Sequence, residues 1–275
     1  MPRSECEWIE VEKTFKKWNF PHCIGAMDGK HITIEAPMKC GTEYFNYKGY
    51  HSIVLFAVVD GNYNFIYSNI GGQGRISDSG IFNSTFFKKC FEDGTMYLPK
   101  PSELPGRTTP SPYVFLGDDA FPLTENIMKP FPGDYDYGTK ERIFNYRLSR
   151  GRRISENVFG IISSVYRVLR KPMLLEPKIA RKVVSAIVHL HNYLRRSSSR
   201  NIYNPSGSFD QECSATGKII KEGIWRKDTE VKLGGLSNLP KVARKSSANA
   251  QSVRNEFMEY FCSLEGEVDF QYDRA

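Results

Sequence analysis

The sequence predicts an α/β protein, because segments of strand type come first in the chain and two long helical segments follow. Apolar runs at 23–34, 51–59 and 113–116 predict strands. Apolar residues recur at three- and four-residue steps across about 140–171 and 177–196, which predicts two helices. With 275 residues and 40% hydrophobic content, the chain can bury a sizeable core.

The strands and the flanking segments follow from local patterns. The run at 51–59 is apolar throughout, which is typical of a strand covered on both faces. An Asp-Gly-Asn-Tyr sequence at 60–63 and a further strand through Ile70 complete a hairpin. Helical spacing of large apolar residues within 1–20 predicts a short helix that leads into the domain.

The predicted domain covers 21–196. Serine and arginine followed by Asn-Pro-Ser-Gly predict a linker over 197–245. Apolar residues at helical spacing then predict a carboxyl-terminal helix and tail over 246–275, with Ser246 or Ser247 as its amino-terminal cap. We expect this tail to dock on the domain or on a partner.

Charge is distributed unevenly along the chain. The net charge is +7, yet the segment 139–200 alone holds fifteen Lys and Arg residues against three Glu residues, which is +12 and leaves −5 for the rest. Such an asymmetry indicates a surface that faces a polyanion, because bound phosphates release counterions. A solvated helix face is the structural alternative.

Several classes of protein are excluded by composition. No apolar run approaches the roughly 18 to 20 residues of a membrane span, and the acidic amino terminus is unlike a signal peptide. The six cysteines show neither a C-x-x-C pair nor the spacing of a zinc site. We therefore expect an intracellular protein with reduced thiols and no membrane partner.

The first strand contains a carboxylate, Asp28, inside an apolar run. Burying an ionised Asp in a sheet is costly unless a cation or hydrogen bonds compensate it. The structural alternative is a turn, since Asp28-Gly29 is a strong hairpin signal.

Further acids stand where they could converge with Asp28. Asp78 follows Ser77 at a predicted helix start, where its structural alternative is a cap or first-turn anion. Asp118 ends the strand at 113–116, and Glu156 lies on the first long helix. Converging carboxylates suit phosphoryl transfer to water or to a DNA 3′ hydroxyl, because two divalent cations about 4 Å apart stabilise the reacting oxygens.

Five motifs in order make the chain recognisable. They are WNFPHCIGAMDGKHI at 18–32, FNYKGYHS at 45–52, SDS at 77–79, LGDDAFPL at 116–123 and RRISENVFG at 152–160. Together they resemble the DDE nuclease domain of PIF/Harbinger transposases and of the host nucleases derived from them. This resemblance implies a ribonuclease-H-like fold, with a mixed central sheet flanked by helices.

The resemblance also implies an acidic triad, which falls on Asp28, Asp118 and Glu156. Asp78 is a fourth candidate metal ligand, and the cofactor is Mg²⁺ or Mn²⁺. Asp118 is preferred to Asp119 because the family motif has its Asp directly after Gly and because strand alternation points adjacent side chains to opposite faces. Asp119 stays as the alternative.

DNA is the expected partner. Candidate contacts to its phosphates are Lys30, His31, Arg150, Arg152 and Arg153. For Lys30 and His31 the alternative is a strand residue with satisfied partners.

Family transposases usually carry a helix-turn-helix region ahead of the nuclease domain and work with a Myb-like DNA-binding protein that helps bring them to the nucleus. The prediction is therefore a nuclear, divalent-metal-dependent DNA endonuclease. The alternative is a domesticated, catalytically silent DNA- or protein-binding module. A metallophosphatase acting on small substrates has only the acids in its favour.

Overall fold

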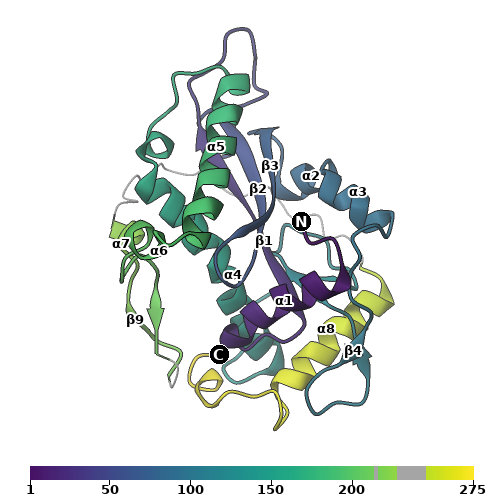
Figure 1. The fold of residues 1–275 in the computed structure, drawn as a ribbon. Helices are drawn as coiled ribbons and strands as arrows, with labels where there is room; N and C mark the ends of the chain where they lie inside the picture. Colours follow the sequence, from purple (N-terminus) through teal and green to yellow (C-terminus); the bar gives the residue numbers. More distant parts are fainter. Residues whose placement is uncertain (214–215, 228–245) are drawn as a thin grey trace.

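The structure is a computed structural model that describes residues 1–213, 216–227 and 246–275. At its centre lies a five-stranded sheet in the order β3-β2-β1-β6-β7 (Figure 1). The strands are β1 (Cys23–Thr33), β2 (Ser52–Val59), β3 (Phe65–Gln73), β6 (Val114–Leu116) and β7 (Ile127–Met128). The first three strands form an antiparallel meander, whereas β6 and β7 run parallel to β1. Helices flank this mixed sheet, which confirms the predicted α/β, ribonuclease-H-like fold.

The remaining elements surround the sheet. The α-helices are α1 (Glu5–Phe15), α2 (Asp78–Asn83), α3 (Phe86–Glu92), α4 (Lys140–Val165), α5 (Pro177–Arg196), α6 (Arg200–Tyr203), α7 (Ile224–Lys227) and α8 (Ala248–Phe261). Short 3₁₀ helices are η1 (Lys16–Trp18), η2 (Arg167–Arg170) and η3 (Asp269–Gln271), and two-stranded ribbons pair β4 (Ser102–Glu103) with β5 (Pro110–Ser111) and β8 (Gln211–Glu212) with β9 (Ile219–Lys221). Among the described residues, none of the helices is long and apolar enough to cross a membrane.

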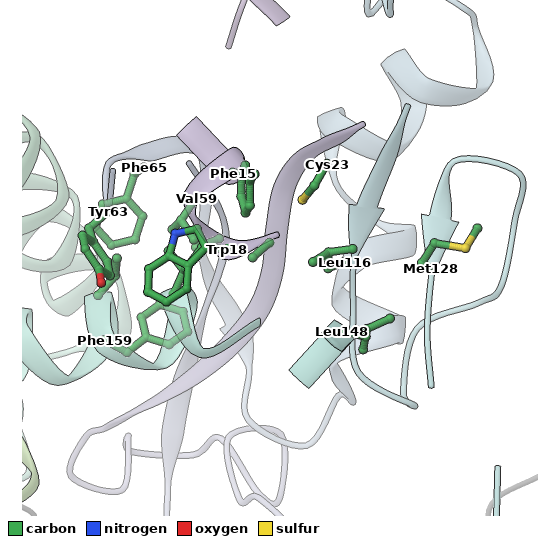
Figure 2. Packing of buried hydrophobic residues seen from close by; sticks show 14 of the residues in the cluster. Phe15, Trp18, Cys23, Val59, Tyr63, Phe65, Leu116, Met128, Leu148 and Phe159 are labelled. Atoms are coloured by element: carbon green, nitrogen blue, oxygen red, sulfur yellow. The ribbon is translucent and has the colours of Figure 1, made fainter. Parts of the chain in front are cut away.

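Two hydrophobic clusters cover the two faces of the sheet. Alternate strand residues such as Ala26 and Leu55 pack with side chains of α4, α5 and α8. Figure 2 shows other members of this cluster, among them Leu116 of β6 and Leu148 of α4. The residues between them, such as Met27 and Phe56, pack with Trp8 of α1 and with α2 and α3. Every residue of β2 is buried, as predicted for a strand covered on both sides.

Serine side chains begin three of the helices. The hydroxyls of Ser4, Ser77 and Ser247 each accept a hydrogen bond from a backbone N–H in the first turn of α1, α2 and α8. Ser77 is therefore the cap of α2, and Asp78 stands at the first helical position with its carboxylate available for another role.

The interpretation of Asp28-Gly29 as a turn is wrong. Both residues lie inside the continuous strand β1, where Asp28 pairs with Ala57 and Gly29 with Phe56. A side chain at Gly29 would overlap the carboxylate of Asp78. Glycine is needed here for this close approach and not for chain reversal.

The first long helix ends six residues before the predicted boundary near 171. Tyr166 leaves the helical conformation with φ −93° and ψ 83°, and η2 follows. The guanidinium of Arg170 donates hydrogen bonds to the carbonyl oxygens of Ser163 and Ser164. These bonds satisfy carbonyls that the helix end would leave without partners.

The structure differs from the linker expected at 197–245. Within the described part of that segment, the chain forms α6, β8, β9 and α7, while residues 214–215 and 228–245 lie outside the described residues. Phe209 stacks on Tyr63 with ring centroids 4.0 Å apart, and Asp210 forms an ion pair of 2.7 Å with Arg226. Turn-forming residues occur here as the sequence indicates, but long-range contacts like these leave no periodic signal.

The carboxyl-terminal helix docks on the domain. Phe257 and Phe261 of α8 pack against Phe20, with ring centroids 5.6 Å and 4.9 Å away. The carbonyl of Ala275 accepts a hydrogen bond from the backbone N–H of Gly138. The tail was expected to dock either on the domain or on a partner, and in the structure it docks on the domain.

A buried histidine is expected to make the stability of the fold depend on pH. His191 is 0% exposed, and its ring nitrogens lie 2.7 Å from the Tyr63 carbonyl oxygen and 2.8 Å from the Tyr203 hydroxyl. Burial lowers the pKa of His191 to about 4, although the Tyr63 carbonyl opposes this shift. The folded pKa lies below the unfolded one, so stability is fully present above about pH 6.5 and is lost as the pH falls toward 4.

Protonation of the His191 imidazole is expected to lower the free energy of unfolding by about 2 kcal/mol between pH 8 and pH 5. Urea unfolding of the native chain and of His191→Gln at both pH values measures it, because Gln cannot titrate. The variant should show a pH dependence smaller by that amount. An identical pH dependence in both proteins would contradict the prediction.

Candidate metal centre

Two carboxylates meet because β1 and β6 run parallel and side by side, with β6 ending at Leu116 and β1 continuing past Asp28. Ala26 of β1 pairs with Leu116 of β6, and both side chains lie in the same hydrophobic cluster. Two residues further along each chain stand Asp28 and Asp118, so alternation aims both carboxylates at the same face and level. Asp119 is exposed and does not join them.

Asp78 of α2 contributes the third carboxylate. One carboxylate oxygen of each of Asp28, Asp78 and Asp118 lies within 4.8 Å of the others. The bare backbone of Gly29 makes room for Asp78. The Oδ1 atom of Asp78 is buried and has no hydrogen-bond partner among the residues that the structure describes. A buried carboxylate oxygen without a partner is costly, and a cation would satisfy it.

The electrostatics of the cluster also favour a bound cation. Burial raises the pKa of Asp28 to about 7; Arg152 opposes this shift, and Asp118 adds to it. Burial, followed by the charge of Asp118, raises the pKa of Asp78 to about 6. Three acids held this close repel one another when ionised, and oxygen ligands suit Mg²⁺ and Mn²⁺. The residues present therefore fit a divalent metal.

Hydrogen bonds orient two of the carboxylates. Asp28 accepts from the backbone N–H of Gly29 at 2.8 Å and from the hydroxyl of Ser155 at 3.2 Å. Asp118 accepts from the N–H of Ala120 at 2.9 Å, and its Oδ2 lies 3.9 Å from a guanidinium nitrogen of Arg152. Arg152 thus reaches the cluster through Asp118. Its contact to phosphate stays a prediction.

Glu156 does not join the three aspartates, in contrast to the implied triad of Asp28, Asp118 and Glu156. Its side chain is exposed, and it lines the same cavity as Asp28 and Asp78. Ser155 occupies the position on α4 that faces Asp28, and the next residue points about 100° further round the helix. The structure therefore brings together Asp28, Asp78 and Asp118, with Glu156 on the cavity wall.

The cavity beside the aspartates has a volume of about 410 Å³. Its lining residues are Asp28, Gly29, Lys30, His31, Tyr47, Lys48, Tyr50, Asp78, Glu156, Phe159, Gly160 and Trp225. Lys30 and His31 line the cavity, and the Nδ1 atom of His31 lies 2.8 Å from the Ser52 hydroxyl, an internal partner of the kind that the structural alternative expects. The lining thus combines three carboxylates, two lysines and four aromatic rings besides that of His31.

Two of the predicted DNA-binding arginines are held by internal partners. Arg150 is buried, with an ion pair of 2.7 Å to Glu212 and a hydrogen bond to Asn19. Arg153 forms an ion pair of 3.0 Å with the same Glu212. These contacts tie the segment around β8 to α4. The structure therefore gives Arg150 a structural role in place of the predicted phosphate contact.

The sequence interpretation missed several residues of the cavity. The FNYKGYHS motif was visible as a motif, but no local pattern assigned Tyr47 or Lys48 to the aspartates. Trp225 lies in the expected linker, where an isolated aromatic residue was the only available signal. The side chain of Ser155 carried no signal apart from its place beside Glu156.

This architecture, with acids from two adjacent parallel strands and a helix start meeting beside a mixed sheet, defines a ribonuclease-H-like domain with a candidate divalent-metal centre. The chain belongs to the DDE superfamily endonuclease family, whose model matches residues 27–192. The resemblance to Harbinger-derived nucleases is thereby confirmed.

Two named relatives are similar to the chain. Protein ALP1-like of Arabidopsis thaliana is 24% identical over 189 residues, which cover 67% of this chain and 46% of that protein. Putative nuclease HARBI1 of Homo sapiens is 25% identical over 180 residues, which cover 62% and 46% respectively. The chain thus spans about half the length of the curated relatives it matches. No solved structure matches it significantly.

Proposed function

We propose that the protein is a divalent-metal-dependent DNA endonuclease of transposase origin, which cuts phosphodiester bonds at the aspartate cluster. The observation that carries this proposal is the convergence of Asp28, Asp78 and Asp118 within 4.8 Å of one another. Membership of the DDE endonuclease family supports the phosphodiester as the substrate. The nuclease named among the relatives supports the same reaction class.

The three aspartates would hold Mg²⁺ or Mn²⁺. A bound divalent cation activates water as a nucleophile and stabilises charge that develops on the phosphate oxygens. Gly29 and Ser155 fix the orientation of Asp28 through their hydrogen bonds. Lys30 lines the same cavity and supplies positive charge for a phosphate of the substrate.

An exposed set of cations on and near α5 would hold the DNA backbone. It comprises Arg167, Lys171, Lys178, Arg181, Lys182, Arg196 and Arg200. These residues belong to the segment 139–200 with its charge of +12. In this proposal the protein acts in the nucleus, with a Myb-like DNA-binding protein as the partner that the family resemblance implies.

A plasmid-nicking assay tests the proposal. The native chain is expected to convert supercoiled plasmid to the open-circular form in Mg²⁺ and to leave it intact in EDTA. Asp28→Asn should abolish nicking, because the variant keeps the size of the side chain and removes one ligand charge. Electron paramagnetic resonance of free Mn²⁺ measures metal binding independently.

The outcomes separate the two predicted functions. Nicking that is equal for the native chain and Asp28→Asn contradicts the endonuclease. DNA binding without nicking at any divalent metal concentration identifies the catalytically silent binding module instead.

A further inference from the structure

The loop between β1 and β2 is built to present an aromatic ring and a lysine to the cavity. Asn46 is 2% exposed, and its Oδ1 accepts hydrogen bonds from the backbone N–H groups of Lys48 and Tyr50. Its amide nitrogen donates to the hydroxyl of Ser52 at 2.8 Å. A single buried side chain thus fixes the tight turn that carries Tyr47, Lys48 and Tyr50. All three line the cavity.

Tyr47 is held without being buried. Its ring packs edge-on against His31, with centroids 5.6 Å apart, and it remains 53% exposed. An aromatic face that is positioned and accessible can take a second ring by stacking.

The opposite wall has an aromatic ring that is also positioned. Trp225 of α7 lies against α4 where residue 160 is glycine, and a side chain there would overlap the indole. The indole N–H donates to the Oδ1 atom of Asn157 at 2.9 Å. Phe159 lies beside Gly160 in the cavity wall. The segment once expected to be a linker therefore supplies a fixed ring to the cavity beside the metal centre.

Two lysines line the same cavity as these aromatic residues and the aspartates. The ammonium of Lys30 lies 6.0 Å from the ring centroid of Phe159, and that of Lys48 lies 5.5 Å from the ring centroid of Tyr47. Within the described residues, neither lysine has a carboxylate within ion-pair distance. Two adjacent cations of this kind suit a phosphate group.

We propose that the part of the cavity walled by Tyr47, Tyr50, Phe159 and Trp225 is a subsite for one unpaired nucleotide of the DNA substrate. Its base stacks on the exposed ring of Tyr47, with Trp225, whose ring the Arg226 guanidinium covers at 4.4 Å, as part of the wall, and its phosphate lies at Lys30 and Lys48. A cavity of about 410 Å³ falls within the range of small-ligand sites, about 300–1,000 Å³. This inference rests on the proposed function, and it specifies DNA that is unpaired at the cut.

The subsite predicts a preference for unpaired bases. A base taken out of the duplex costs its stacking and pairing energy, and that cost is least where the base is already unpaired. Stacking on an aromatic side chain is sequence-tolerant, since every base has a π-face. We therefore expect an extra, unpaired base in a duplex to raise affinity whatever its identity.

The test compares two labelled duplexes that differ only at one bulged position, which carries either an adenine or an abasic analogue. Binding is measured by fluorescence anisotropy with the full chain in EDTA. The adenine duplex is expected to bind about tenfold more tightly, as one stacked base provides. Trp225→Ala and Tyr47→Ala should each reduce this ratio toward one, and Trp225→Phe should retain most of it.

The matched control is Phe86→Ala, because Phe86 is 62% exposed on α3 and does not line the cavity. It should leave the ratio unchanged. If Trp225→Ala proves unfolded by circular dichroism, the half-exposed Tyr47 decides the question. Equal affinity of the native chain for the two duplexes, or a ratio that Tyr47→Ala leaves intact, overturns the subsite.

Failure of the subsite and failure of the nuclease are distinguishable. Asp28→Asn keeps every aromatic wall residue and should keep the base preference. Nicking without a base preference supports the proposed nuclease activity and contradicts the proposed subsite. Base preference without nicking in Mg²⁺ supports the subsite in a protein that binds DNA and does not cut it.

Discussion

Replacing Asp118 by Asn is expected to lower Mg²⁺-dependent plasmid nicking by about 10³-fold, whereas Asp119→Asn should leave it within about threefold. A metal site supplies several kcal/mol of transition-state stabilisation, and about 4 kcal/mol corresponds to that factor. The two residues are adjacent and chemically identical, so any difference between the two variants comes from where the carboxylate lies. Only Asp118 lies within 4.8 Å of Asp28 and Asp78.

Initial nicking rates at saturating Mg²⁺ measure this effect, and Mn²⁺ binding provides a readout that does not depend on turnover. Asp118→Asn should weaken Mn²⁺ binding as well as nicking. A loss of activity in Asp119→Asn equal to that in Asp118→Asn would show that the register of β6 does not decide the ligand.

Arg150→Ala is expected to lower the free energy of unfolding by about 2–3 kcal/mol, because it removes a buried ion pair and the hydrogen bond to Asn19, while Arg153 stays paired with Glu212. The side chain of Arg150 is 4% exposed and that of Glu212 is 10% exposed, with 2.7 Å between their charged atoms. The guanidinium also lies 4.9 Å from the ring centroid of Phe270. Urea unfolding measures the loss, and the exposed Arg196→Ala is the control, with an effect within about 0.5 kcal/mol.

The salt dependence of DNA binding distinguishes a structural arginine from a residue that contacts DNA. A phosphate contact lowers the slope of log affinity against log salt by about one when it is removed. Lys178→Ala is expected to do so, whereas Arg150→Ala should keep the slope while losing stability. If Arg150→Ala is stable and its salt slope is reduced, Arg150 contacts a DNA phosphate, as the sequence suggested.

Much of the fold is predictable from the sequence because local patterns carry it. The apolar run of β2, the hairpin after Val59 and the helical spacing along α5 each identify an element with nearly correct bounds. The end of α4 at Val165 was missed because the side chain of Arg170, and not a proline or glycine, satisfies its last carbonyls.

The site was predictable in part. Asp28 is indicated by an acid inside an apolar strand, Asp118 by an acid after a strand end, and Asp78 by its motif. Sequence order could not tell that Gly29 accommodates Asp78 or that Ser155, one residue before Glu156, faces Asp28. The orientation of a helix about its own axis depends on how it packs, and motif position does not give it.

The sequence by itself determined the main strands and helices of the domain, its family and the acids available for a metal. Periodicity and turn residues act over a few neighbours, so they can be recognised without knowing the fold. The tertiary structure decided which carboxylates converge, that Arg150 is internal and that Trp225 joins the cavity. These features arise from the register between β1 and β6 and from contacts between distant segments. They depend on the packing of the whole chain.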